Sequence, residues 1–432
     1  MIKKNILIIY WHGRIFPLKD TIEKHLYSWK SYSKHNVIYI NIRFGFPRAL
    51  LKKIRIDVVI FHNLFIDRRW FPKHFQKYLE KCEYLKKLKC LKIAIPQDEF
   101  FNTKILNDFI NDFGIIYILT LANKDSIKKI YNKIDSGKVK FKQVLPGYID
   151  YKTIESINNL KIKNIPRKID IGYRAFKNAY NLGEKGLQKI KIAEIIDKEA
   201  KLIGLKTDIA VYESLRNFIR GEKWFEFLLS CKATIGVEGG ASVLDKDGKI
   251  SERVKEYQTN NPDSSFDDVK RNCFPQEDNT LNYSCISPRH LEACITETCQ
   301  LLLEGKYNNV LKPWIHYIPV KVDYSNVHEV LNLLKNDKYV NEIKKNAYRD
   351  VVQSGEYTYK NFIDEVEKEV IDKYVINNGF NYSKQSNLLL RILNIIEQTN
   401  WLVTKIESRI IEIVPKKIVV KIRNFYGKIV ER

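Results

Sequence analysis

The sequence predicts an α/β protein with two doubly wound, Rossmann-like domains that face a cleft, followed by a C-terminal amphipathic helical tail. Three observations lead to this prediction. The chain has 432 residues, which exceeds one ordinary hydrophobic core and favours two domains. Short, nearly continuous apolar runs alternate with helical segments in both halves, as is typical of buried parallel sheets. No apolar run approaches the ~20 residues that a membrane-spanning helix needs.

The first domain is predicted to span residues 1–150. Polar residues and glycines follow several of its strands, at the edge where doubly wound sheets bind ligands. The predicted strands are 5–10, 36–42, 56–62, 91–96, 115–120 and 141–145, with helices expected at 18–33 and 126–133.

A basic segment at 151–168 is predicted to link the first domain to a second one at 169–375, and the tail is 376–432. The second domain repeats the alternation of strands and helices, interrupted by an irregular polar insert at 245–281. Its predicted elements are strands at 169–174, 208–210, 233–237 and 300–303, helices at 186–203 and 224–230, and closing helices over 326–374.

The net charge and the cysteine content limit the cell compartment and the binding partners that we expect for this protein. A net charge of +23 suits nucleic acid, anionic lipid or phosphorylated substrates, or reflects a uniformly basic, solvated surface. The chain lacks Arg-Gly-Gly and RNA-binding aromatic motifs, which argues against nucleic acid. Seven cysteines without a Cys-x-x-Cys pair indicate a reduced, cytoplasmic protein and argue against a zinc site. The N-terminal apolar run is too short for a signal peptide and is better explained as a strand.

The tail carries a basic amphipathic pattern. After Pro415, apolar residues fall on one helical stripe and lysines on another, a pattern suited to an anionic membrane surface. The segment 384–432 is therefore a candidate membrane contact. The alternative is a terminal helix that packs on its own domain or on a second subunit.

The segment that begins at Ser287 has the chemistry of a nucleotide-sugar pocket. Ser287 is a good N-cap, and Pro288 suits the first helical position. Arg289 and Glu292 are three residues apart and share a helix face. A helix N-terminus beside an arginine can hold a phosphate, and a carboxylate one turn later can accept bonds from sugar hydroxyls. The alternative is a surface pair of Arg289 and Glu292.

Several motifs, in this order, resemble a known family. Two doubly wound domains, a linker and a C-terminal helical return look like a GT-B glycosyltransferase, and the motifs are similar to the bacterial "group 1" branch of surface-polysaccharide assembly. Ala210 departs from the branch, where a serine is expected. The matching pieces are Gln97-Asp98-Glu99, Pro146-Gly147-Tyr148, Asp170–Arg174 with Gly183, Gly186 and Lys189, Asp208-Ile209, Gly221 with Trp224, Glu238–Ser242, Ser287-Pro288-Arg289 with Glu292, and His316-Tyr317.

The resemblance implies roles for residues of the second domain. Arg174 and Lys189 would bind the donor diphosphate, which gains negative charge as the sugar leaves. Glu292 would bind the donor ribose, with Arg289 and Ser287 at the phosphate end. The resemblance implies neither a metal nor a cofactor, because the nucleotide sugar is a substrate. For the two basic residues, the alternative is ordinary surface charge.

Glu238, Gly239 and Gly240 follow a predicted strand. Small residues at such a place let backbone N–H groups approach a ligand, and Glu238 would then contact the donor sugar. The alternative is a tight turn into the polar insert.

The first domain should hold the acceptor and any catalytic base. An inverting transfer needs a carboxylate or histidine near the acceptor hydroxyl. Asp98 and Glu99 follow a predicted strand and are the first candidates, and His12 and His62 at equivalent strand ends are the second. A retaining transfer needs no such base, and these residues would then bind the acceptor.

Together these features predict a glycosyltransferase that moves a sugar from a nucleotide-sugar donor to a saccharide acceptor, such as a lipid-linked polysaccharide or lipopolysaccharide. We expect it in the cytoplasm, peripheral at the inner face of the cell membrane. Two alternatives remain: a GT-B-like nucleotide-sugar epimerase, and a non-catalytic basic protein that binds membranes.

Overall fold

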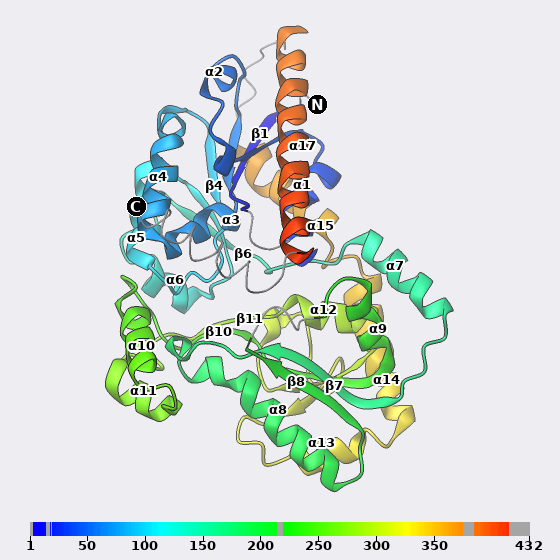
Figure 1. Cartoon of the computed structure of the whole chain (residues 1–432). Helices are drawn as coiled ribbons and strands as arrows, with labels where there is room; N and C mark the ends of the chain where they lie inside the picture. The colour runs from blue at the N-terminus through cyan, green and yellow to red at the C-terminus, as the bar shows by residue number, and fades with distance from the viewer. Residues whose placement is uncertain (1–2, 14–17, 19, 214–218, 375–383, 414–432) are drawn as a thin grey trace.

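The computed structural model describes residues 3–13, 18, 20–213, 219–374 and 384–413, and it confirms the predicted fold class. Two parallel sheets, each covered by helices, form the upper and lower halves of the molecule in Figure 1. The two sheets match the predicted pair of doubly wound domains.

The N-terminal sheet has six parallel strands in the order β2-β1-β3-β4-β5-β6. The strand order reverses at β1, which pairs with both β2 and β3. Every residue of β1 is buried, as expected for a strand covered by helices on both faces. The elements are β1 (Asn5–Tyr10), α1 (Asp20–Tyr32), β2 (Asn36–Asn41), α2 (Arg48–Leu51), β3 (Val58–Phe61), α3 (Asn63–Ile66), α4 (Pro72–Lys81), β4 (Leu91–Ala94), α5 (Thr103–Phe113), β5 (Tyr117–Thr120), α6 (Lys124–Ile130) and β6 (Lys140–Gln143).

The C-terminal sheet has five parallel strands in the order β13-β12-β9-β7-β8, with its own reversal at β7. Helix α7 (Tyr151–Ile162) lies within the predicted linker and connects the two halves. The elements are β7 (Ile169–Phe176), α8 (Glu184–Leu202), β8 (Thr207–Tyr212), α9 (Glu222–Ser230), β9 (Cys231–Gly236), α12 (Pro288–Ile295), β12 (Cys299–Leu303), β13 (Ile318–Val320), α13 (Val327–Leu333) and α14 (Asp337–Ala347).

The insert is more regular than the sequence predicted, and the prediction of an irregular segment at 245–281 was wrong. It contains α10 (Lys249–Asn260) and α11 (Phe266–Cys273), which form a small core of their own. A capping box between Ser265 and Asp268 starts α11. The insert is flanked by the antiparallel pair β10 (Gly239–Ala241) and β11 (Tyr283–Cys285).

The chain returns to the N-terminal domain after α14. Helix α15 (Tyr359–Val366), a π-helical turn (Glu367–Ile371) and α16 (Asp372–Tyr374) pack there, and Phe362 and Val370 belong to the N-terminal core. The first crossing and this return meet where Ile149 pairs with Thr358. The predicted limits of the domains, at 1–150, 169–375 and 376–432, stay predictions.

Helix α17 (Lys384–Ile413) continues along the N-terminal domain and packs against β2 (Figure 1). Leu390 and Leu393 are buried in the N-terminal core. This part of the tail therefore packs on its own domain, the alternative that the sequence left open, while 414–432 lies outside the described residues. Among the described helices, none is long and apolar enough to cross a membrane.

Candidate active site

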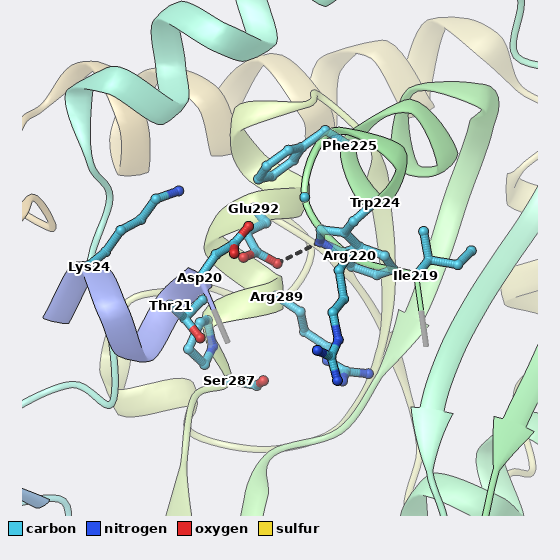
Figure 2. Close-up of a pocket in the computed structure, with 12 residues that line it drawn as sticks. Asp20, Thr21, Lys24, Ile219, Arg220, Trp224, Phe225, Ser287, Arg289 and Glu292 are labelled. Carbon is cyan, nitrogen blue, oxygen red and sulfur yellow. Dashed lines mark hydrogen bonds between the residues drawn. The ribbon is translucent and has the colours of Figure 1, made fainter. Parts of the chain in front are cut away.

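A cavity of about 190 Å³ lies between the two domains (Figure 2). The first turn of α1, which follows β1, forms one wall. The opposite wall comes from the second domain, where the segment 219–225 follows β8 and the segment 287–292 begins α12. The cavity therefore lies where doubly wound sheets place their ligands.

Glu292 is the central carboxylate of this cavity. Trp224 Nε1 donates a hydrogen bond of 2.8 Å to Glu292 Oε2, which fixes the side chain toward the cavity (Figure 2). Burial raises the pKa of Glu292, while the bond from Trp224 and the charge of Arg289 act in the opposite direction. The predicted position of Glu292, one turn into α12 and beside Arg289, agrees with the structure.

Two guanidinium groups line the same cavity. In Figure 2 the guanidinium groups of Arg289 and Arg220 lie at the same end of the cavity, on the side of Ser287. Arg289 Nη1 donates a hydrogen bond of 2.7 Å to the carbonyl oxygen of Arg174, and this bond holds the Arg289 side chain in place. Ser287 is the N-cap of α12 by backbone conformation, and no capping bond from its hydroxyl to this helix is found in the described part of the chain. The two guanidinium groups can form charge-assisted hydrogen bonds with a diphosphate.

Arg174 is not among the described residues that line this cavity. Its guanidinium stacks 4.1 Å from the centre of the Phe227 ring and pairs with Asp208 Oδ2 at 2.7 Å. It also donates 2.7 Å to the Asp208 carbonyl, so it ties β7 to β8. Lys189, its predicted partner, lies on α8 with Nζ 3.4 Å from Asn178 Oδ1. Among the described residues, neither Arg174 nor Lys189 lines the cavity, and their role at a diphosphate stays a prediction.

Glu238 and the two glycines make contacts within the protein. Glu238 Oε1 accepts a hydrogen bond of 2.8 Å from the backbone N–H of Tyr307, and Glu238 Oε2 lies 3.6 Å from Lys185 Nζ. Gly240 has φ +143, and a Cβ there would lie 1.9 Å from the Tyr283 carbonyl oxygen. Strand pairing between β10 and β11 thus explains this glycine, and Gly239 is its neighbour in the same strand. The glycines thus lie in a paired strand rather than in a tight turn, and the donor contact of Glu238 stays a prediction.

Glu99 is fully buried and joins the two domains. It accepts hydrogen bonds from the Thr120 hydroxyl, the Leu121 N–H at 2.9 Å and the Tyr131 hydroxyl at 2.5 Å. Tyr283, from β11 of the second domain, donates a further bond at 3.0 Å. Burial raises the pKa of Glu99 against the effect of these donors. Four donors and no exposed surface leave Glu99 without access to an acceptor, which does not support its predicted role as a base.

The other predicted base candidates also lie outside the cavity. Asp98 is exposed at φ +45, and its carbonyl accepts 2.5 Å from the buried Arg69. His62 is fully buried with Nε2 2.9 Å from His25 Nδ1, and burial lowers its pKa well below the ordinary value. His12 is half-buried, and burial together with Arg43 lowers its pKa to about 4.

Sequence reasoning missed the residues of the first domain that line the cavity. These are Asp20, Thr21 and Lys24 on α1, and Arg220 and Phe225 face them from the second domain. A signal was present, because the sequence placed a helix directly after the first strand. Gly221 and Trp224 were singled out as a motif but received no role.

Comparisons with known proteins give short sequence matches and distant structural ones. No family model matches this chain. Protein O-glucosyltransferase 1 of Mus musculus is 51% identical over 43 residues, which is 10% of this chain and 11% of that protein. The same enzyme of Homo sapiens is 42% identical over 64 residues, covering 13% and 16%. The chain thus matches less than a fifth of the length of these curated relatives.

The similar solved structures are glycosyltransferases and a sugar-phosphate synthase. A glycosyltransferase of Rickettsia africae aligns with TM-score 0.47 and 9% identity over 87% of this chain and all of that one. HepE of Anabaena, solved with UDP-glucose, aligns with TM-score 0.45 and 8% identity over 85% and 99%. Sucrose-phosphate synthase of Thermosynechococcus elongatus gives 0.47 and 8% over 85% and 98%. Such distant likeness does not support a conclusion on activity.

Proposed function

We propose that this protein is a glycosyltransferase that moves a sugar from a nucleotide-sugar donor to a saccharide acceptor. The observation that carries the proposal is the interdomain cavity, where Glu292 lies with the guanidinium groups of Arg220 and Arg289. In the reaction, an acceptor hydroxyl oxygen bonds to the anomeric carbon of the donor. The bond between that carbon and the phosphate oxygen breaks, its electron pair leaves with the nucleoside diphosphate, and the hydroxyl proton is released.

Each group in the cavity suits one part of the donor. The carboxylate of Glu292 accepts from ribose hydroxyls, since two oxygens are present and Trp224 occupies one of them. The guanidinium groups of Arg220 and Arg289 stabilise the charge that develops on the leaving diphosphate. The first turn of α12, which begins at Pro288, adds the positive end of a helix dipole.

The short sequence matches support the same class of activity. The matched relatives are O-glucosyltransferases by name, although each match covers a small part of this chain. We extend the proposal to the finer expectations: a branch that assembles bacterial surface polysaccharide or lipopolysaccharide, a lipid-linked acceptor, transfer without a metal or a cofactor, and a cytoplasmic site at the inner membrane face.

Helix α17 supports the membrane part of this proposal. Its buried face packs on β2, while Leu388, Ile395 and Leu402, spaced by seven residues, are 54–61% exposed. An exposed apolar stripe of this kind suits the interface of a bilayer. Vesicle flotation with and without anionic lipid tests it. The test variant is Ile395→Asp, which should lower vesicle binding at least fivefold without changing nucleotide binding, and equal flotation of the variant and the wild type would contradict this role.

The donor site is tested by calorimetry with a panel of nucleotide sugars and nucleotides. Glu292→Ala should weaken binding roughly 10- to 100-fold, because a hydrogen bond to a charged group contributes about 1.5–3 kcal/mol. Glu329→Ala, an exposed carboxylate on α13, is the matched control. No binding of any nucleotide at millimolar concentration would overturn the proposal. Conversion of the donor sugar without an acceptor would indicate an epimerase instead.

A further inference from the structure

A second and larger cavity continues from the donor cavity along α1. It has a volume of about 660 Å³ and lies between α1, α7 and the start of α9. Asp20, Lys24 and Phe225 line both cavities, so the two are continuous. This volume is well within the range of ligand sites in proteins, about 300–1,000 Å³. We call it the α1–α7 groove.

Two contacts tie the opposite walls of the α1–α7 groove together. Tyr32 on α1 donates 2.9 Å to Asp150 Oδ1. Lys24 Nζ donates 2.7 Å to Thr153 Oγ1 on α7. The groove is therefore formed before any ligand binds, which lowers the cost of ordering it.

The groove walls alternate aromatic rings with hydroxyl groups. Tyr27 and Tyr32 are half-buried, and each offers a ring face, while their hydroxyls are bonded to Glu397 and Asp150. Ser31 and Ser156 add exposed hydroxyls that can both donate and accept, whereas Ser28 is buried and donates to the His25 carbonyl. A sugar ring presents the matching surfaces, with C–H groups on its faces and hydroxyls around its edge.

Charge at the groove favours a neutral or hydroxyl-rich ligand over a phosphorylated one. Lys24 and Lys152 line the groove, but four carboxyl groups outnumber them: Asp20 and Glu23 in the first turn of α1, Asp150, and Glu222 on α9. Their carboxylates would repel a phosphate, whereas they accept from hydroxyl groups. The diphosphate belongs instead with the guanidinium groups of the donor cavity.

Asp20 marks where the two cavities meet. Figure 2 shows its carboxylate directed from α1 toward Glu292 across the donor cavity. A saccharide in the groove would thus pass Asp20 to reach the donor cavity, with the rest of the acceptor extending along α1 and α7.

We infer that the α1–α7 groove is the acceptor subsite and that it binds an oligosaccharide of two or more sugars, whose reacting end enters the donor cavity past Asp20. This inference rests on the proposed function for the identity of the reaction. Binding of a glycan to the groove can be measured independently of that reaction. It also moves the acceptor from the strand ends near Asp98 to the helix pair α1 and α7.

The test is binding of the purified full chain to an array of defined glycans of one to six sugars. We expect at least one glycan of two or more sugars to bind, and its single terminal sugar to bind at least tenfold more weakly. Ser156→Trp and Ser31→Trp, at exposed positions on opposite walls, should each lower glycan affinity at least tenfold. Asn158→Trp, exposed on α7 outside the groove, is the matched control.

The outcomes separate this inference from the proposed function. UDP binding that persists while no glycan binds, or glycan binding that both tryptophan variants leave unchanged, overturns the groove. Equal affinity for the single sugar and the longer glycan overturns the oligosaccharide claim. Glycan binding without binding of any nucleotide supports the groove while the donor proposal fails. Glu292→Ala should keep the glycan affinity and lower only the nucleotide affinity.

Discussion

Glu397 should make the docking of α17 depend on pH. This carboxyl is 5% exposed, and its Oε1 accepts from the Tyr10 hydroxyl at 2.5 Å and the Tyr27 hydroxyl at 3.2 Å. Burial raises the pKa of Glu397 to about 7, although the hydrogen bonds from both tyrosines act in the opposite direction. The perturbation is Glu397→Gln, which is neutral at every pH.

The magnitude follows from the pKa difference between the folded and unfolded states. A glutamate in an unfolded chain titrates near 4.3, so the folded pKa is raised by roughly 2.5 units, and each unit corresponds to about 1.36 kcal/mol. A raised carboxyl pKa adds stability that is fully present below the unfolded pKa and is lost as the pH rises through the folded pKa. The wild type should therefore lose about 3 kcal/mol, mostly between pH 4.5 and pH 7, relative to the variant.

The assay is urea unfolding of both proteins at pH 5, 6, 7 and 8, with hydrogen exchange of the α17 amides to localise the effect. The free energy of unfolding of the variant minus that of the wild type should rise with pH. Glu407→Gln is the control on the same helix, since it removes the 2.7 Å ion pair with Arg43 instead of a buried carboxyl, and it should destabilise. A difference between Glu397→Gln and the wild type that stays constant within about 1 kcal/mol from pH 5 to pH 8 would refute the reasoning.

Two further substitutions test the packing around β10 and β11. Tyr283→Phe removes one of the four donors to the buried Glu99, and thermal melts should show a loss of about 1–3 kcal/mol because the carboxylate keeps its desolvation cost; an unchanged melting temperature would contradict the interdomain bond. Gly240→Ala puts a Cβ 1.9 Å from a backbone oxygen and should cost more than about 3 kcal/mol or abolish soluble expression. Gly239→Ala, where the nearest atom is 3.8 Å away, should be nearly neutral in the same expression and melting assays, and equal losses in both would contradict the steric account.

Local sequence patterns predicted the elements well where one physical signal dominates. The apolar run at residues 5–10 became β1 with the same limits, and the proline at 288 starts α12 as expected. The polar insert was the exception. Its helices bury few apolar residues, so their periodicity is weak, and the capping box at Ser265 was the available signal.

The candidate site was predicted only in part, because the sequence does not show which way a side chain turns. Glu292 lies at the cavity because its helix and neighbours are local in the sequence. Arg174 turns inward because Asp208, on the neighbouring strand, pairs with it. Glu99 is buried because Tyr283, 184 residues away, covers it from the other domain. Such partners are set by the packing of distant segments, which spacing along one chain does not reveal.

The core of the N-terminal domain has a consequence for how the chain is synthesised. Leu281 from the insert, Tyr283 from β11, Phe362 from α15 and Leu393 from α17 belong to that core. During translation, residues 1–150 emerge from the ribosome long before residues 281–393 have been synthesised. The first domain should therefore stay incomplete, with apolar surface uncovered, until roughly nine-tenths of the chain has emerged. Its folding during translation is a property of the whole polypeptide, and a fragment that stops at residue 150 would lack part of its own interior.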